Sequence, residues 1–502
     1  MRRLCALLLC TALMFPSASA ASDPVWPQWA EPALSWGQEA GISQSFLSAP
    51  EQVVTRGMAA QLLYESAGRP AVSEACPFSD VSGDYADAVT WAAGQGCLTG
   101  VGNGRYEPER PVTRQEFAAI LWRRAACPAA PVQGLDAFSD AGATAEWARS
   151  AMLWSLQTDV MRGRSGGLLA PLDQITVAEA VAMLQRSSQL PEVSSLRADL
   201  AALTGAPRPI GSQGEADAVQ YLKERFEEMG YSVTLQPYTD GQGRTSHNVI
   251  AVRPSEQEDG DILILSAHHD SVPTAYGASD NASGTAALLY AAQALKDAPS
   301  DTELRFVSFT DEENGKNGSR AYTASLTEAE KARMIGAIQF DMLGGLGSQA
   351  TMVCTMDGEA NWVSDLLQEK DPALARSAET ASDHASLQLA GIPSVLLMQD
   401  SAGYLYHTAA DTADQLDVYA IASAAETAVE AAEEICSPDT PSYQALAREQ
   451  GDGYTYRQTR QNVIYFSASR ADTESYIGAA GELADTWEVS GNGWTDTYET
   501  YR

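Results

Sequence analysis

Residues 261–270 have the sequence DILILSAHHD, in which an apolar run of strand type, 261–267, is followed by two histidines and an aspartate. The stretch 303–313, ELRFVSFTDEE, has the same form: a strand-type run at 303–309 precedes an aspartate and two glutamates. Two further apolar runs follow at 337–343 and 394–399. The helical patterns between and after these runs lie at 218–230, 283–295 and 421–435. This alternation predicts an α/β domain over residues 187–440, with a largely parallel sheet in a three-layer sandwich.

The polar residues at the ends of these runs have the chemistry of a metal site. The five histidines of the chain all lie in this block: His247, His268, His269, His384 and His407. In open α/β sheets ligands bind at the carboxyl ends of the strands, so we expect these side chains to gather there. Imidazoles and carboxylates without a nearby cysteine suit zinc with open positions, and the number of carboxylates favours two ions that share one of them. Of the adjacent Glu312 and Glu313, one can bind metal while the other stays free as a general base.

Six motifs occur in order over about residues 190–436: HHDSV, GASDNASGTAALL, FTDEENGKNGSRAY, FDM, SDHASLQLAGIPSVLL and YHTAADTADQLD. Together they resemble the bacterial di-zinc aminopeptidases of metallopeptidase family twenty-eight. The resemblance implies two zinc ions with five protein ligands: His268 and Asp341 for one ion, Glu313 and His407 for the other, and Asp280 between them.

The same resemblance implies three further roles. Glu312 would be the general base, Asp270 would orient the His268 ring, and Tyr406 would donate to the oxyanion of the tetrahedral intermediate. The remaining polar residues have plainer interpretations. We expect His269 to pack or to support a ligand rather than to bind metal itself, His384 to shape the substrate pocket, and His247 to be structural. Asp311 and Asp411 are open between an orienting role and a capping one.

A different pattern precedes this block. Residues 77–125 combine a helix, a glycine-rich loop, a proline turn and a second helix that Thr113 and Glu116 open as a capping box. Similar units occupy about 24–69 and 137–186. Each shared feature recurs in two of the units. The FSD openings begin at Phe78 and Phe138, the first-helix tryptophans are Trp91 and Trp154, and the Thr-Arg steps begin at Thr55 and Thr113. The units resemble the S-layer homology domain in its usual set of three.

That resemblance implies a surface partner. The arginines of the Thr-Arg steps, Arg56 and Arg114, would contact an anionic, often pyruvylated, cell-wall polysaccharide. The third unit has Val177 where arginine is expected, so we expect two working grooves. The alternative is that the repeats form only a helical spacer, with their aromatic residues in its core.

The two ends of the chain carry further signals. Residues 1–20 have two arginines, an apolar stretch and an Ala-Ser-Ala site, which predict a signal peptide cleaved before Ala21. No later run is long enough to predict a transmembrane helix. Residues 441–502 are aromatic and polar, and we expect a small appendage with a strand at NVIYFSA. The formal net charge of −34 argues against nucleic acid and anionic lipid as partners.

Taken together, these patterns predict a secreted zinc exopeptidase attached to the cell wall or S-layer of a bacterium. We expect an aminopeptidase that acts on peptides with a free N-terminus. A carboxypeptidase or a glutaminyl cyclase-like enzyme on the same fold remains an alternative, although such cyclases use one zinc and Asp280 is present here. A non-catalytic S-layer or adhesion protein is a third reading, which the loss of Glu312 or of a ligand would indicate.

Overall fold

The computed structural model describes residues 26–130, 134–299, 301–347, 350–399, 405–438, 440–451, 483–491 and 494–501. The chain forms two compact units. One contains the chain up to Arg124 together with Ala170–Ser188, and the other contains Ala125–Leu169 and the chain from Gln189 onward. The predicted signal peptide lies outside the described residues. Among those residues, no helix has both the length and the apolar character needed to cross a bilayer.

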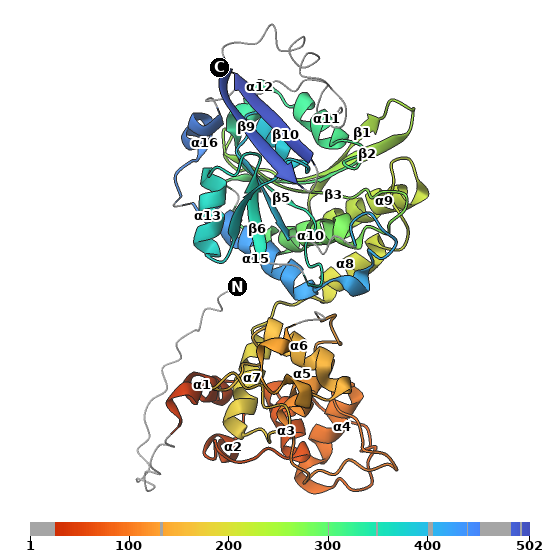
Figure 1. Ribbon diagram of the computed structural model, residues 1–502, viewed down its shortest axis with the longest axis vertical. Coiled ribbons are helices and arrows are strands. Elements are labelled where there is room, and N and C mark those ends of the chain that lie inside the picture. Colours follow the sequence, from red (N-terminus) through yellow and green to blue (C-terminus); the bar gives the residue numbers. More distant parts are fainter. Residues whose placement is uncertain are drawn as a thin grey trace. The chain divides into compact units, whose positions relative to one another are not determined.

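The helices of the first unit are α1 (Glu31–Glu39), α2 (Gln44–Leu47), α3 (Arg56–Ser66), α4 (Ala86–Gly94), α5 (Arg114–Arg124) and α7 (Val177–Ser188), with short turns η1 (Gln28–Ala30) and η2 (Gly83–Tyr85) (Figure 1). A threonine precedes each of α3, α5 and α7. Thr55 Oγ1 accepts a hydrogen bond from Met58 N, and Thr113 N donates to Glu116 Oε2 at 2.8 Å. These contacts satisfy backbone groups that a helix start leaves unpaired, so the capping box predicted at Thr113 forms.

The three segments before these helices are joined by a closed ring of backbone hydrogen bonds. Val54 N donates to Ile175 O at 2.9 Å, Ile175 N to Val112 O at 3.0 Å, and Val112 N to Val54 O at 2.9 Å. All three residues are buried. Each of the predicted repeats therefore supplies one member of a shared centre.

The second unit is built on an eight-stranded sheet with the order β1-β2-β4-β3-β5-β8-β6-β7. Its strands are β1 (Ser232–Thr239), β2 (Thr245–Arg253), β3 (Ile262–His268), β4 (Glu303–Phe309), β5 (Met334–Phe340), β6 (Thr351–Thr355), β7 (Ala375–Ala378) and β8 (Ser394–Gln399). The central strands β4, β3, β5 and β8 are parallel, but β1 and β2 form an antiparallel hairpin, β2 is antiparallel to β4, and β6 is antiparallel to β8. The sheet is therefore mixed, which corrects the expectation of a largely parallel sheet.

The reason for the difference lies in the outer strands. Every residue of β3 and β5 is buried, as in a strand covered on both faces, whereas exposed and half-buried positions make up β1. An outer strand needs no continuous apolar run, and the sequence pattern of Ser232–Thr239 has none. The third predicted strand, 337–343, begins earlier and ends at Phe340, so Asp341 follows the strand directly.

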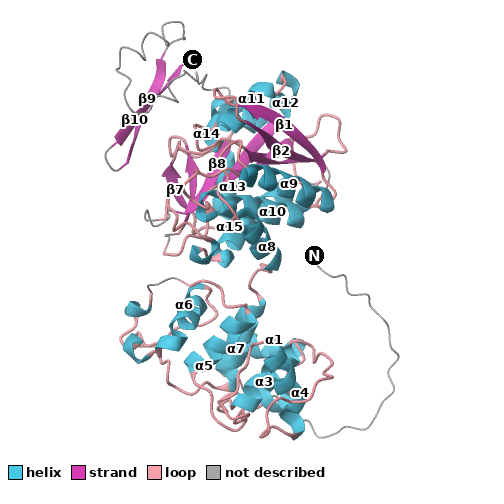
Figure 2. Ribbon diagram, turned by 90° about the vertical axis from the view of Figure 1, so that its right-hand side faces the viewer, coloured by secondary structure: helices cyan, strands magenta, loops and turns pink. Residues whose placement is uncertain are grey.

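Helices cover both faces of this sheet (Figure 2). The helices of one layer are α8 (Ser194–Leu203), α9 (Gln213–Glu228), α10 (Gly284–Leu295), α13 (Trp362–Lys370) and α15 (Val418–Ile435). Those of the other face include α11 (Asn317–Ser325), α12 (Glu328–Arg333) and α14 (His384–Leu389). The expected three-layer arrangement is thus present.

The remaining elements of this unit are α6 (Arg149–Gln157), α16 (Gln444–Gly451) and the antiparallel pair β9 (Leu483–Gly491) and β10 (Trp494–Tyr501), with turns η3 (Leu135–Ala137), η4 (Ala141–Ala143), η5 (Glu146–Ala148), η6 (Ala278–Ser283) and η7 (Ala413–Gln415). The strand expected at NVIYFSA lies outside the described residues.

Candidate active site

The parallel strands at the centre of the sheet end on the same edge, and the site begins there. His268 is the last residue of β3 and stands opposite Phe309, the last residue of β4. The turn that carries Glu312 and Glu313 follows β4 directly, and Asp341 follows β5. The strand register therefore brings side chains from three distant segments to one edge.

Two groups of ligand atoms meet at this edge. One group is His268, Asp280 and Asp341, and the other is Asp280, Glu313 and His407, with the atoms of each group within 4.8 Å of one another. His268 Nε2 lies 3.4 Å from Asp280 Oδ1 and 3.4 Å from Asp341 Oδ1. His407 Nε2 lies 3.2 Å from Asp280 Oδ2 and 3.0 Å from Glu313 Oε2. The structure thus brings together the five predicted ligands, with one oxygen of Asp280 in each group.

The chemistry of this donor set fits zinc. The set consists of carboxylates and imidazoles, which are ordinary zinc ligands, and it is incomplete in a way that leaves positions open. Asp341 Oδ1 and His407 Nε2 are buried and make no hydrogen bond to the described residues. Buried carboxylates this close to one another repel unless a cation lies between them. Each group of three could therefore hold one metal ion.

Asp270 connects the two sides of the site. Its Oδ1 accepts a hydrogen bond from Glu312 N at 3.1 Å, and its Oδ2 accepts one from Glu313 N at 3.2 Å. Its Oδ1 also lies 3.3 Å from His268 Nδ1. The Asp270 carboxylate thus holds the turn of Glu312 and Glu313 against β3. It also faces His268 Nδ1, the ring nitrogen on the side away from the other ligand atoms. The predicted orienting role would fit these contacts.

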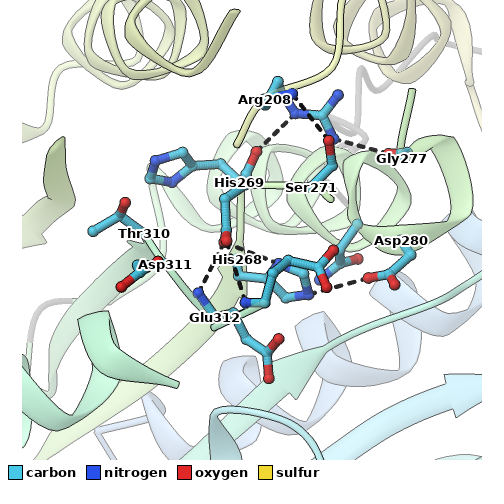
Figure 3. A network of polar contacts seen from close by, with 12 residues as sticks. Arg208, His268, His269, Ser271, Gly277, Asp280, Thr310, Asp311 and Glu312 are labelled. Atoms are coloured by element: carbon cyan, nitrogen blue, oxygen red, sulfur yellow. Dashed lines mark hydrogen bonds and ion pairs between the residues drawn. The ribbon is translucent and has the colours of Figure 1, made fainter. Parts of the chain in front are cut away.

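The two adjacent glutamates differ in their surroundings. Glu313 Oε1 accepts from Val272 N at 3.1 Å, while its other oxygen faces His407. Burial, together with Asp280, raises the pKa of Glu313 to about 7. Burial raises the pKa of Glu312 well above its ordinary value; His268 lowers it in part, and nearby carboxylates raise it further. In Figure 3 the Glu312 carboxylate points away from the contacts of its own backbone.

Tyr406 lies at the exposed side of the site. Its ring stacks on the His407 ring with centroids 3.8 Å apart and an angle of 19° between the planes. The tyrosine side chain is half exposed, with 48% of its surface accessible. The stack holds Tyr406 beside one of the two ligand groups, where a substrate could reach its hydroxyl.

Two further side chains hold the ligands in position; the sequence left the role of Asp411 open and did not single out Ser382. Asp411 is fully buried; its Oδ1 accepts from Ser279 N at 2.6 Å and its Oδ2 from Asp280 N at 3.1 Å. Ser382 Oγ donates to Asp341 Oδ2 at 2.7 Å and leaves Oδ1 directed at His268. Both residues stand inside the quoted motifs, YHTAAD and SDHASL, which was the only signal available.

The other histidines stand apart from the ligand groups. His269 Nδ1 lies 2.9 Å from Ser308 Oγ, and its ring is fully buried. Burial lowers the pKa of His269 to about 4, so the ring is neutral at neutral pH. His384 Nε2 lies 2.8 Å from Glu379 O, and His247 is in β2, opposite Pro237. These positions agree with packing roles for His269 and His247, whereas the pocket role of His384 stays a prediction.

The two arginines of the helical unit are engaged inside that unit. Arg56 Nε donates to Tyr106 O at 2.7 Å and Nη2 to Thr99 O at 2.6 Å, with the guanidinium 4.4 Å from the centre of the Tyr106 ring. Arg114 is buried, and its Nη1 lies 3.0 Å from Glu179 Oε1. Their contact with a polysaccharide stays a prediction.

Comparison with known proteins agrees with both resemblances. Residues 248–432 match Peptidase family M28, and residues 77–118 and 137–181 match the S-layer homology domain. The chain thus contains a domain of Peptidase family M28 and S-layer homology segments, which confirms the two families predicted from the sequence.

The individual relatives each match a part of the chain. Aminopeptidase YwaD of Bacillus subtilis is 36% identical over 183 residues, which are 35% of this chain and 38% of that protein. Leupeptin-inactivating enzyme 1 of Streptomyces exfoliatus is 37% identical over 147 residues, 29% of this chain and 33% of that protein. A solved structure of an aminopeptidase from Aneurinibacillus sp. strain AM-1 is 25% identical, covers 48% of this chain and 93% of its own, and has a TM-score of 0.46. The chain therefore spans less than two fifths of the length of either curated relative.

Proposed function

We propose that this protein is a zinc-dependent aminopeptidase that acts at the bacterial cell surface. One observation carries the proposal: Asp280 belongs to two ligand groups, one buried and one partly exposed, that together contain two imidazoles and three carboxylates. The domain of Peptidase family M28 and the aminopeptidase relatives support the reaction class. The ligand groups found among the described residues lie at this edge of the sheet.

The residues that would hold zinc are the five of the two ligand groups. His268 and Asp341 would bind one ion, Glu313 and His407 the other, and Asp280 would contribute to both. Bound zinc supplies Lewis acidity, which polarises a carbonyl and lowers the pKa of water. Asp270, Ser382 and Asp411 would keep the ligands in place through the hydrogen bonds described above.

Glu312 would move the proton. Its pKa lies well above that of an ordinary carboxyl group because the side chain is buried, and this makes it a stronger base than an exposed glutamate. Its carboxylate would accept a proton from the attacking water and return it to the leaving amine. The Tyr406 hydroxyl would donate a hydrogen bond to the oxygen that becomes negative in the tetrahedral intermediate.

We propose that the enzyme acts from the N-terminus of its substrates. Two zinc ions would outweigh the negative charge of Asp280, Asp341 and Glu313, so these carboxylates do not themselves select the end of the substrate. The match to Aminopeptidase YwaD supports an exopeptidase that starts from a free α-amino group.

The remaining parts of the chain suggest where the enzyme works. S-layer homology segments and the predicted signal peptide support secretion and attachment to an anionic polysaccharide of the cell wall. Arg56 and Arg114 are the residues that we propose for that attachment. The third repeat lacks the arginine, with Val177 in its place.

A panel of matched peptides tests the reaction. We expect the full-length protein with zinc to release the first residue from peptides with a free N-terminus and to leave their acetylated counterparts intact. Equal rates on both would overturn the aminopeptidase proposal. A peptide that begins with glutamine separates the cyclase alternative, since a cyclase releases ammonia and keeps every residue. Release of the last residue instead would identify a carboxypeptidase.

A further inference from the structure

Arg208 is a buried cation that no motif identifies. It lies in the connection between α8 and α9, outside the segment that matches the peptidase family, and is 1% exposed. Its guanidinium donates to four backbone carbonyls: His269 O at 2.7 Å, Tyr276 O at 2.7 Å, Gly277 O at 2.8 Å, and Leu203 O. Figure 3 shows the contacts of Arg208 with His269 and Gly277, above His268 and Asp280.

Three of the four carbonyls belong to one functional segment. Residues 269–277 connect His268 at the end of β3 to η6, which carries Asp280. Arg208 binds the first residue of that segment through Nε and the last through Nη2. The backbones are joined as well, because Arg208 N donates to Ser271 Oγ at 2.9 Å and Ser271 N donates to Arg208 O at 3.3 Å. The two ligands at either end of the segment are therefore held to one side chain.

The contact at Gly277 shows how close this fit is. Gly277 has a φ of +60°, a left-handed conformation that favours glycine. A Cβ atom there would lie 2.3 Å from Asp280 O and 3.0 Å from Arg208 Nη2. The chain therefore passes between the arginine and the shared ligand with no room for a side chain.

The charge of Arg208 does not explain its position by itself. Burial lowers its pKa to about 10, so the side chain is still charged at neutral pH. Burying a charge is costly, and the described bonds of this one go to carbonyls rather than to a carboxylate. A cation near a metal site also repels the metal ion. What the guanidinium offers in return is a rigid fork whose donors reach several acceptors at once.

We propose that Arg208 is a positioning residue for the metal site, which sets the spacing between His268 and Asp280 by holding both ends of the segment that joins them. The inference rests on the proposed zinc site. Residues that hold metal ligands in place without touching the metal themselves typically contribute 10–100-fold to metal affinity. Fixing the segment should tighten zinc binding, whereas the positive charge alone should weaken it, so the two effects have opposite signs.

Zinc affinity of the full-length protein, measured by competition with a chromophoric chelator, tests this without any assay of activity. We expect Arg208→Met and Arg208→Lys both to bind zinc roughly 10–100-fold more weakly than the natural protein. Lysine keeps the charge but cannot donate to four carbonyls at once. Weak zinc binding in Arg208→Lys would therefore show that the hydrogen bonds of the planar guanidinium matter, and not its charge. Unchanged or tighter binding in Arg208→Met would overturn the proposal.

Arg253 provides a matched control. It also donates to backbone carbonyls, those of Leu295 at 3.0 Å and Pro299 at 2.8 Å, but it stands opposite Leu304 near the start of β4, at the other edge of the sheet. Arg253→Lys should lower thermal stability and leave zinc affinity within about twofold, because its contacts are remote from the ligands. A similar loss of affinity in this variant would mean that general destabilisation explains the result.

Two further measurements cover the remaining outcomes. Should Arg208→Met fail to fold, Ser271→Ala takes its place: it removes the acceptor of Arg208 N and should weaken zinc binding by several-fold. The visible spectrum of the cobalt-substituted protein, which reports ligand geometry, should change in Arg208→Lys and not in Arg253→Lys. If the natural protein itself binds no zinc, the proposed function fails; if it binds zinc and all Arg208 and Ser271 variants bind it equally, only the positioning role fails.

Discussion

The helical unit and the carboxyl edge of the sheet treat buried charge in opposite ways. In the helical unit each of several shielded acids meets a base: Glu179 faces Arg114 at 3.0 Å, Glu116 faces Arg110 at 2.7 Å, and Glu65 faces Arg69 at 2.8 Å. At the edge of the sheet, buried Asp280, Asp341 and Glu312 crowd together, and the nearby Arg208 gives its hydrogen bonds to carbonyls instead. The helical unit balances its charges internally, whereas the edge of the sheet needs cations from outside.

The largest effect should come from the adjacent glutamates. Glu312→Gln keeps the shape of the side chain and removes the proton acceptor, so turnover should fall roughly 10²–10⁴-fold with zinc content near normal. Glu313→Gln replaces an anionic ligand by a neutral one and should lose part of the zinc, with activity falling as a consequence. Metal analysis and kinetics on both variants check this.

Added zinc should distinguish the roles of the two glutamates. It should restore some activity to Glu313→Gln and none to Glu312→Gln. If Glu312→Gln is the variant that sheds zinc, the two roles are reversed. Normal turnover in both variants would contradict the mechanism as a whole.

The next largest effect should be a different response of the two units to the removal of zinc. At a zinc concentration one thousand times its dissociation constant, binding stabilises the native state by about 4 kcal/mol. A chelator should therefore lower the unfolding temperature of the sheet-containing unit and leave that of the helical unit unchanged. Calorimetry of the full-length protein with and without chelator measures both transitions. Equal shifts in the two would break the contrast between them.

Breaking an ion pair in the helical unit should lower the stability of that unit and leave zinc binding unchanged. Arg114→Met leaves the shielded Glu179 without its guanidinium, which should cost about 3 kcal/mol of stability. Zinc content should not change. The double variant Arg114→Met/Glu179→Gln serves as the control, since removing both charges should recover part of the loss. No recovery would mean that the pair does not act as a pair.

The smallest effect concerns attachment. Replacing Arg56 by Ala should weaken binding of the full-length protein to cell-wall sacculi that retain their polysaccharide about tenfold, or ~1.4 kcal/mol. Arg114→Ala should weaken it less, because that side chain is more deeply buried against Glu179. Arg105→Ala, at an exposed position of the second repeat, is the control. Unchanged binding in a variant that lacks both Arg56 and Arg114 would remove the argument for two binding grooves.

What the sequence could predict follows from the range of the interactions. Strands β4 and β8 have the predicted bounds and β3 differs by one residue at each end, because continuous apolar runs mark strands buried on both faces. The five ligands could be named because each stands in one of the motifs that carry the family resemblance.

The features that the sequence missed or left open depend on contacts between distant segments. Arg208, which was missed, binds the carbonyls of His269 and Gly277. Asp411, whose role was left open, binds the backbone of Ser279 and Asp280. A backbone group has no signature in the sequence, so neither partner could be recognised. The hairpin of β1 and β2 was missed for a related reason, since outer strands lack an apolar run.

The backbone ring of Val54, Val112 and Ile175 bears on why the helical unit includes the segment of Ile175, although Val177 stands where the other two segments have arginine. Without that segment Val54 N would lose its acceptor and Val112 O its donor. An unsatisfied interior group of this kind costs about 1–3 kcal/mol, so two would remove much of the margin by which a small domain stays folded. The three segments therefore form a closed set rather than an open array, and removal of one should destabilise the other two even where it contributes no arginine.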